Sequence, residues 1–172
     1  DEGDRVTQLP DFTEPLAEPE IAEPAPEEMV KVIGPLRLSI PLYNVYLNEA
    51  DEWSRRLQTE LSEWALELPK VLPDSVIALA HSLLGSSATV GFDALSGLAR
   101  ELEHALQWTQ LQTTGTAVEG QVYTAVAEDI RRLLHQFAAG FLKEPDAAVQ
   151  EALRQLHADK VALTPTSTDT AT

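Results

Sequence analysis

His81 combines a chemically reactive side chain with unusually small surroundings. It lies in the stretch ALAHSLLGSSATVGF, and at helical spacing its neighbours are Ile77 and Ala78 one turn before it and Gly85 and Ala88 in the turns after it. A neutral imidazole at a pH near about 7 is a competent nucleophile toward phosphorus. In-line transfer of a phosphoryl group also needs open space on both sides of the phosphorus. These residue types therefore point to phosphoryl transfer at an exposed histidine.

The helix that carries His81 predicts this exposure. At 100° per residue its apolar side chains gather on one face, and His81 points roughly the opposite way; that apolar face contains Val76, Leu79, Leu83, Ser87 and Val90. Glycine inside a helix costs about 1 kcal/mol relative to alanine, so Gly85 needs a reason. Close approach of another surface is such a reason.

The elements that must position this histidine are predicted to be helices. We expect a first helix that begins near Pro41 and carries an apolar stripe to Leu68, a second from Asp74 to about Val90, and a third capped by Asp93. A fourth follows the loop TTGTAVEG and presents apolar residues from Val122 to Phe141, and a shorter fifth begins near Pro145. Short connections make neighbours antiparallel. The predicted fold class is all-α: an antiparallel four-helix bundle with an additional C-terminal helix.

Composition divides the chain into three parts. Residues 1–30 contain ten acidic residues, one basic residue and five of the 11 prolines, which is typical of a disordered acidic linker. The predicted bundle occupies residues 31–160, and residues 161–172 are a Thr/Ser-rich tail or linker. The stretch VKVIGPLRLSI before Pro41 could form a short helix or an extended segment on the bundle. Linkers at both ends suggest a domain taken from a longer, multidomain chain.

Charge and composition exclude several classes of function. The net charge of −16 would repel a phosphate backbone or an anionic lipid surface, so nucleic acid is an unfavourable partner. The sequence has no stretch of the roughly 20 apolar residues that a membrane-spanning helix needs. It also has no cysteine, which favours a reducing compartment. We expect a cytoplasmic domain without direct membrane insertion, monomeric in isolation.

The stretch AHSLLGSSATVGF resembles the motif of histidine-phosphotransfer (HPt) domains, in which His-x-x-Lys-Gly is followed by small residues and a glycine. The following LSGLARELEHAL is similar to the next helix of that family. The resemblance covers about residues 41–140, with its specific part at 79–106. It is similar in particular to the domain of CheA-type chemotaxis kinases, and IPLYNVYLNEADEWSRRL resembles the first helix of HPt modules in multi-HPt kinases of type IV pilus systems (ChpA or PilL-like).

The resemblance implies a mechanism. A histidine kinase catalytic domain, with ATP and Mg²⁺ bound there and no cofactor bound here, would phosphorylate His81 at Nε2. A response-regulator receiver domain would then take the phosphoryl group onto its aspartate. Glu103 would accept a hydrogen bond from Nδ1–H and fix the tautomer. The module would be no enzyme on its own, but a fragment of a protein histidine kinase. Its partners would dock on Ile77, Ala78, Leu84, Gly85 and Ala88.

One position departs from the family motif. The motif lysine, three residues after the histidine, is Leu84 here. Its loss removes a favourable charge worth about 1 kcal/mol at an exposed site. Arg100 could supply charge instead. The alternative function is a degenerate scaffold that docks two-component partners without phosphotransfer; a third is an unrelated helical interaction domain.

The other histidines fit simpler roles. His104 and His135 lie opposite the apolar stripes of their helices but lack small neighbours, so we expect both to be solvated, and His157 to be peripheral. A metal site is disfavoured, because no Glu-x-x-His pair repeats on two facing helices as di-iron bundles require.

Overall fold

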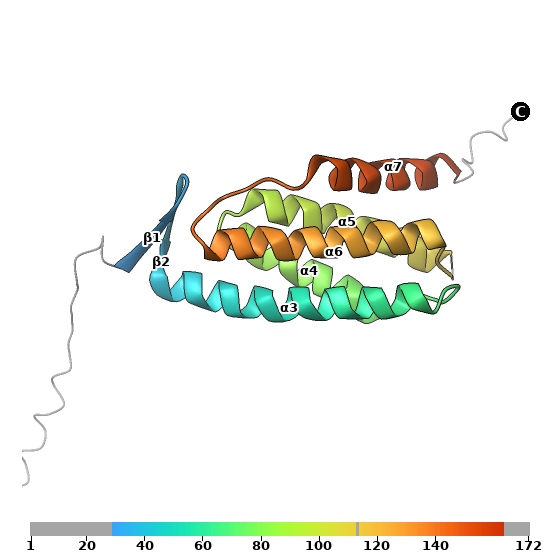
Figure 1. The fold of residues 1–172 in the computed structure, drawn as a ribbon, viewed down its shortest axis with the longest axis horizontal. Coiled ribbons are helices and arrows are strands. Elements are labelled where there is room, and N and C mark those ends of the chain that lie inside the picture. The colour runs from blue at the N-terminus through green and yellow to red at the C-terminus, as the bar shows by residue number, and fades with distance from the viewer. Residues whose placement is uncertain (1–28, 113, 164–172) are drawn as a thin grey trace, which may run out of the picture.

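The computed structural model describes residues 29–112 and 114–163. A short hairpin comes first, with strands β1 (Val30–Ile33) and β2 (Leu36–Ser39). Five helices follow: α3 (Ile40–Leu66), α4 (Asp74–Thr89), α5 (Asp93–Leu111), α6 (Ala117–Ala138) and α7 (Ala147–Leu163). Helices α3 to α6 run side by side along one long axis, and α7 lies against α5 and α6 (Figure 1). The bundle with an additional C-terminal helix is therefore as predicted. The predicted linker at residues 1–30 lies almost wholly outside the described residues.

The stretch VKVIGPLRLSI adopts the extended alternative of the two that the sequence left open, and it adds two short strands to the predicted all-α fold. Strands β1 and β2 pair antiparallel, with Val30 opposite Ser39 and Ile33 opposite Leu36. Gly34 makes the turn with a φ of 58°, a conformation that glycine adopts without strain. Ile33 and Leu38 are buried against the helices. The strands are only four residues long, too short for a clear alternating pattern in the sequence.

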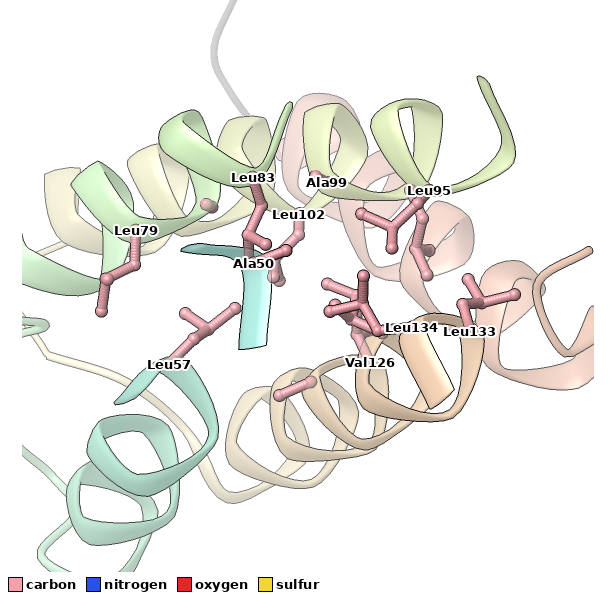
Figure 2. Close-up of a cluster of buried hydrophobic side chains, with 14 of the residues drawn as sticks. Ala50, Leu57, Leu79, Leu83, Leu95, Ala99, Leu102, Val126, Leu133 and Leu134 are labelled. Atoms are coloured by element: carbon pink, nitrogen blue, oxygen red, sulfur yellow. The ribbon is translucent and has the colours of Figure 1, made fainter. Parts of the chain in front are cut away.

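Helices α3 to α6 bury most of the apolar stripes that the sequence predicts. Figure 2 shows side chains from α3, α4, α5 and α6 meeting in one core, among them Ala50, Leu57, Leu79, Leu83, Leu95, Leu102, Val126 and Leu133. These side chains are almost fully removed from solvent. Because the core takes one face of every helix, the opposite faces are left for polar residues and for a site.

Several predicted helix ends shift when the backbone is seen. Asp74 and Asp93 are the first residues of α4 and α5, and neither helix has a side-chain cap, because Pro73 and Phe92 occupy the cap positions. An acidic residue in the first turn still complements the helix dipole. Gly91 stops α4 as predicted, with a φ of 83°. Helix α7 begins at Ala147, two residues after the predicted start at Pro145.

Helix α6 begins earlier and ends earlier than predicted. Thr116 and Glu119 form a capping box, in which the Thr116 side chain accepts from the Glu119 N–H and the Glu119 carboxylate accepts from the Thr116 N–H. The second half of the predicted loop is therefore helical. At the other end α6 stops at Ala138, and Phe141 is exposed instead of continuing the buried face.

Among the described residues, no helix is both long enough and apolar enough to cross a membrane.

Candidate functional site

His81 projects from the outer face of α4. The buried side chains of this helix are Val76, Leu79, Ala80, Leu83 and Ser87, and they all lie on the side facing the core. The His81 side chain is 70% exposed. On the inner face, the Ser87 hydroxyl lies 2.7 Å from the Tyr46 hydroxyl of α3, and burial raises the pKa of Tyr46. The core thus fixes the rotation of α4, and that rotation presents the imidazole to solvent.

Glu103 reaches His81 from the neighbouring helix α5. Its carboxylate oxygens lie 3.1 and 3.3 Å from His81 Nδ1. A carboxylate can only accept, so this contact requires the ring proton on Nδ1. In the neutral ring Nε2 is then left with a free lone pair. The Glu103 side chain is only 12% exposed, whereas the ring that it holds is open to solvent.

A second contact between these two helices has the same register. Gln110 Nε2 donates to Asp74 Oδ1 at 2.6 Å, near the start of α4 and the end of α5. Seven residues separate Asp74 from His81, and seven separate Glu103 from Gln110. Both contacts therefore follow from the same antiparallel pairing of α4 and α5. The His81–Glu103 pair is held by the packing of whole helices and not by a loop.

The predicted docking residues surround His81 on the surface. Ala78, Gly85 and Ala88 are exposed, and Ile77 and Leu84 are half-buried with part of their surface against the core. A side-chain carbon added at Gly85 would meet nothing within 4 Å, so the fold itself does not require glycine there. Because Gly85 has no side chain, the surface beside the imidazole does not project, which suits the approach of a second protein.

A shallow groove adjoins this surface between α3 and α4. It has a volume of about 280 Å³, and its lining includes Leu42, Val45, Gly85 and Thr89. Leu42 and Val45 are apolar yet 38% and 52% exposed. Neither residue is among those predicted from the sequence. They are apolar residues that lie beside the buried stripe of α3, which contains its tyrosines, and not on it. Apolar residues outside a buried stripe are the sequence pattern that could have indicated an exposed apolar surface.

The remaining histidines lie away from this pair. His104 and His135 are exposed, as predicted. His157 is half-buried on α7, with its ring at 71° to the ring of Trp108 and 6.4 Å between centroids, and its Nδ1 is buried without a hydrogen-bond partner among the described residues. His104 and His157 line a cavity of about 220 Å³ between α5 and α7. Neither has an acidic partner placed as Glu103 is for His81 in the described part of the chain.

Within residues 29–112 and 114–163 no three His, Cys, Asp or Glu side chains gather in a way that could hold a metal ion. The chemistry available at the surface is that of the imidazole itself. An oriented, exposed nucleophilic nitrogen with a carboxylate behind it can accept a group from one protein and deliver it to another.

Comparison with protein families gives one match at the same place. The model of the Hpt domain matches residues 41–159, well over half of the chain, and the match includes both His81 and Glu103. The comparison with curated proteins gives no match.

Proposed function

Because the chain belongs to the Hpt domain family, whose members carry out histidine phosphotransfer in two-component signalling, we propose that His81 is its phosphoacceptor. The observation that carries the proposal is the contact of His81 Nδ1 with the Glu103 carboxylate, at 3.1 Å, on an otherwise exposed ring. Of the four histidines in the sequence, His81 combines an exposed ring with an orienting acidic partner. This pairing leaves Nε2 as the attacking atom.

The proposed first step transfers the phosphoryl group to His81. Nε2 attacks the γ-phosphorus of ATP held in a histidine kinase catalytic domain, where Mg²⁺ supports the departing phosphates. The Nε2–P bond forms as the bond from phosphorus to the β,γ-bridging oxygen breaks, and ADP leaves with the electron pair. Positive charge that develops on the ring is offset by the Glu103 carboxylate. The proton on Nδ1 stays between the two groups.

The proposed second step removes the phosphoryl group from His81. An aspartate oxygen of a receiver domain attacks phosphorus from the side opposite Nε2, and the Nε2–P bond returns its electrons to the ring. Ile77, Ala78, Leu84, Gly85 and Ala88 form the docking surface for both partners. In this scheme the domain catalyses little alone and acts as the shuttle of a cytoplasmic, CheA-type kinase in chemotaxis-like or twitching-motility signalling.

A phosphoryl donor that needs no partner protein tests the acceptor directly. The purified domain is incubated with potassium phosphoramidate, and the acid-labile phosphate is located by mass spectrometry and ³¹P NMR. We expect phosphate on His81 well before His104, an exposed histidine on α5 without such an acidic partner. H104Q is the matched control for H81Q, and both should leave the free energy of unfolding within about 0.5 kcal/mol of the parent.

Equal labelling of His81 and His104, or none at His81, contradicts the proposal. A second experiment adds a CheA-type catalytic domain with ATP and Mg²⁺ and then a receiver domain. Transfer through His81 supports the relay. Binding of the receiver domain with no phosphate on His81 supports instead the scaffold function, for which the absence of the motif lysine at Leu84 is the motivating observation.

A further inference from the structure

The motif lysine is replaced by Leu84, and the neighbouring helix carries an arginine at the same height. The contacts His81–Glu103 and Asp74–Gln110 set the register of α4 against α5. Moving three residues toward the C-terminus of α4 leads from His81 to Leu84. Moving three residues toward the N-terminus of α5 leads from Glu103 to Arg100. Both shifts are about 4.5 Å in the same direction along the bundle, because the helices are antiparallel.

Leu84 and Arg100 also occupy facing flanks of their helices. Leu84 is half-buried and packs against the core, which places it beside a neighbouring helix and not on the outermost surface. Arg100 lies about 60° around α5 from Glu103, whose carboxylate contacts α4. Arg100 is on the outward side of Glu103, because the core residues Leu102 and Leu106 occupy the inward face of α5. The two residues therefore border the same seam, one turn from the His81–Glu103 pair.

Arg100 is free to act there. It is exposed, and in the described part of the chain it makes no hydrogen bond or ion pair. Other arginines of the bundle are engaged: Arg131 with Asp51, Arg132 with Asp129, and Arg154 with Glu101. A guanidinium group presents donors in a fork that matches two phosphoryl oxygens, so it suits a phosphorylated side chain better than an ammonium group does.

We infer that Arg100 is the cation that contacts the phosphoryl group on His81 and replaces the lysine missing at position 84. This inference rests on the proposed function of His81. The guanidinium group donates hydrogen bonds to the phosphoryl oxygens while Nε2 holds the phosphorus, and no bond to Arg100 forms or breaks. The charge that the family motif supplies from the histidine's own helix comes here from the next helix.

The test measures the initial rate of His81 phosphorylation by potassium phosphoramidate in the parent and in R100Q. We expect R100Q to react about fivefold more slowly at low salt, the effect of one exposed charge. The difference should shrink as salt is raised, because screening weakens exposed pairs. R100K should fall between R100Q and the parent, because it keeps the charge but not the fork of donors. L84K, introduced into R100Q, should restore it by returning the lysine to its motif position.

The matched control is R37Q. The Arg37 side chain is exposed and makes no hydrogen bond or ion pair in the same described region. It lies on β2, beside the turn between α4 and α5, where Leu36 meets Gly91. That turn is ten residues of chain from His81, about 15 Å along a helix. R37Q should react as the parent does.

An unchanged rate in R100Q, failure of L84K to rescue it, or an equal loss in R37Q would overturn the role of Arg100. In all three cases His81 is still phosphorylated, so the proposed function survives. Absence of phosphate on His81 in the parent is the separate result that removes the proposed function and this inference together. Thermal melting of R100Q should match the parent, because the native side chain has no partner among residues 29–112 and 114–163.

Discussion

Removing the Glu103 carboxylate should slow the phosphorylation of His81 without unfolding the domain. In E103A the ring loses its only protein partner among the described residues. No charged acceptor then favours the Nδ1–H tautomer over the Nε2–H tautomer. In E103Q the side-chain amide oxygen can still accept from Nδ1–H, but the negative charge is gone. The two variants therefore separate orientation of the ring from stabilisation of its positive charge.

The magnitude follows from the geometry. A hydrogen bond to a charged group contributes about 1.5–3 kcal/mol, and the 70% exposure of the imidazole reduces this toward about 1–2 kcal/mol. We expect E103A to lower the initial phosphorylation rate by about 5- to 30-fold. E103Q should lose less, because it keeps the acceptor. The phosphoramidate assay gives the rates, and ¹⁵N NMR of the imidazole gives the tautomer ratio in each variant.

Stability measurements make the result interpretable. The Glu103 carboxylate is almost buried, so replacing it with an uncharged amide of similar shape should leave the melting temperature close to that of the parent. The reasoning is wrong if both variants fold normally and phosphorylate His81 at the parental rate. It is also wrong if E103A retains the Nδ1–H tautomer to the same extent as the parent, because another group would then be orienting the ring.

Three further predictions concern the scaffold. Y46F should lower the free energy of unfolding by about 1–2 kcal/mol in urea titrations, because it leaves the buried Ser87 hydroxyl without its 2.7 Å partner, and adding S87A should cost little more. G115A should cost about 1–3 kcal/mol by the same measurement, since the new carbon would lie 2.0 Å from a ring carbon of Trp64; an unchanged midpoint would refute this. Hydrogen bonds from two arginines, of which Arg131 has the larger effect, hold the pKa of Asp51 below its ordinary value of 3.8. The Asp51 charge therefore stabilises the fold above that pH, and this contribution is lost as the pH falls through the lowered pKa. D51N should therefore cost up to about 1 kcal/mol at neutral pH and nothing in strong acid, and a cost that persists in acid would contradict the assignment.

The helices could be predicted because their signals are local. Apolar residues at spacings of three and four mark the buried faces of α3 to α6, and these faces are buried as predicted. The exposure of His81 follows from the same pattern, because a residue opposite an apolar stripe must face outward. The glycine stop at Gly91 is equally local, since its positive φ is unfavourable for other residues.

Tertiary contacts decide two features that local signals leave open or miss. The β1–β2 hairpin is too short to be stable alone, and it persists because Ile33 and Leu38 are buried against the bundle. Phe141 continues the apolar spacing of α6, but the chain turns away after Ala138 toward α7. The start of α6 is different in kind, because the Thr-x-x-Glu sequence at Thr116–Glu119 is a local capping signal that marks the start of this helix without any tertiary contact.

From residue type and helical periodicity within α4, the sequence predicts His81 as the residue that could do the chemistry and predicts that its side chain is exposed, as the structure shows. The family resemblance implied that Glu103 lies beside it, but the contact itself depends on how the helices pack. Glu103 meets His81, and Arg100 is level with Leu84, because the turn at Gly91 and the burial of both apolar stripes fix how far α5 slides along α4. A register between two helices is set by contacts along their whole length, so no short stretch of sequence contains it.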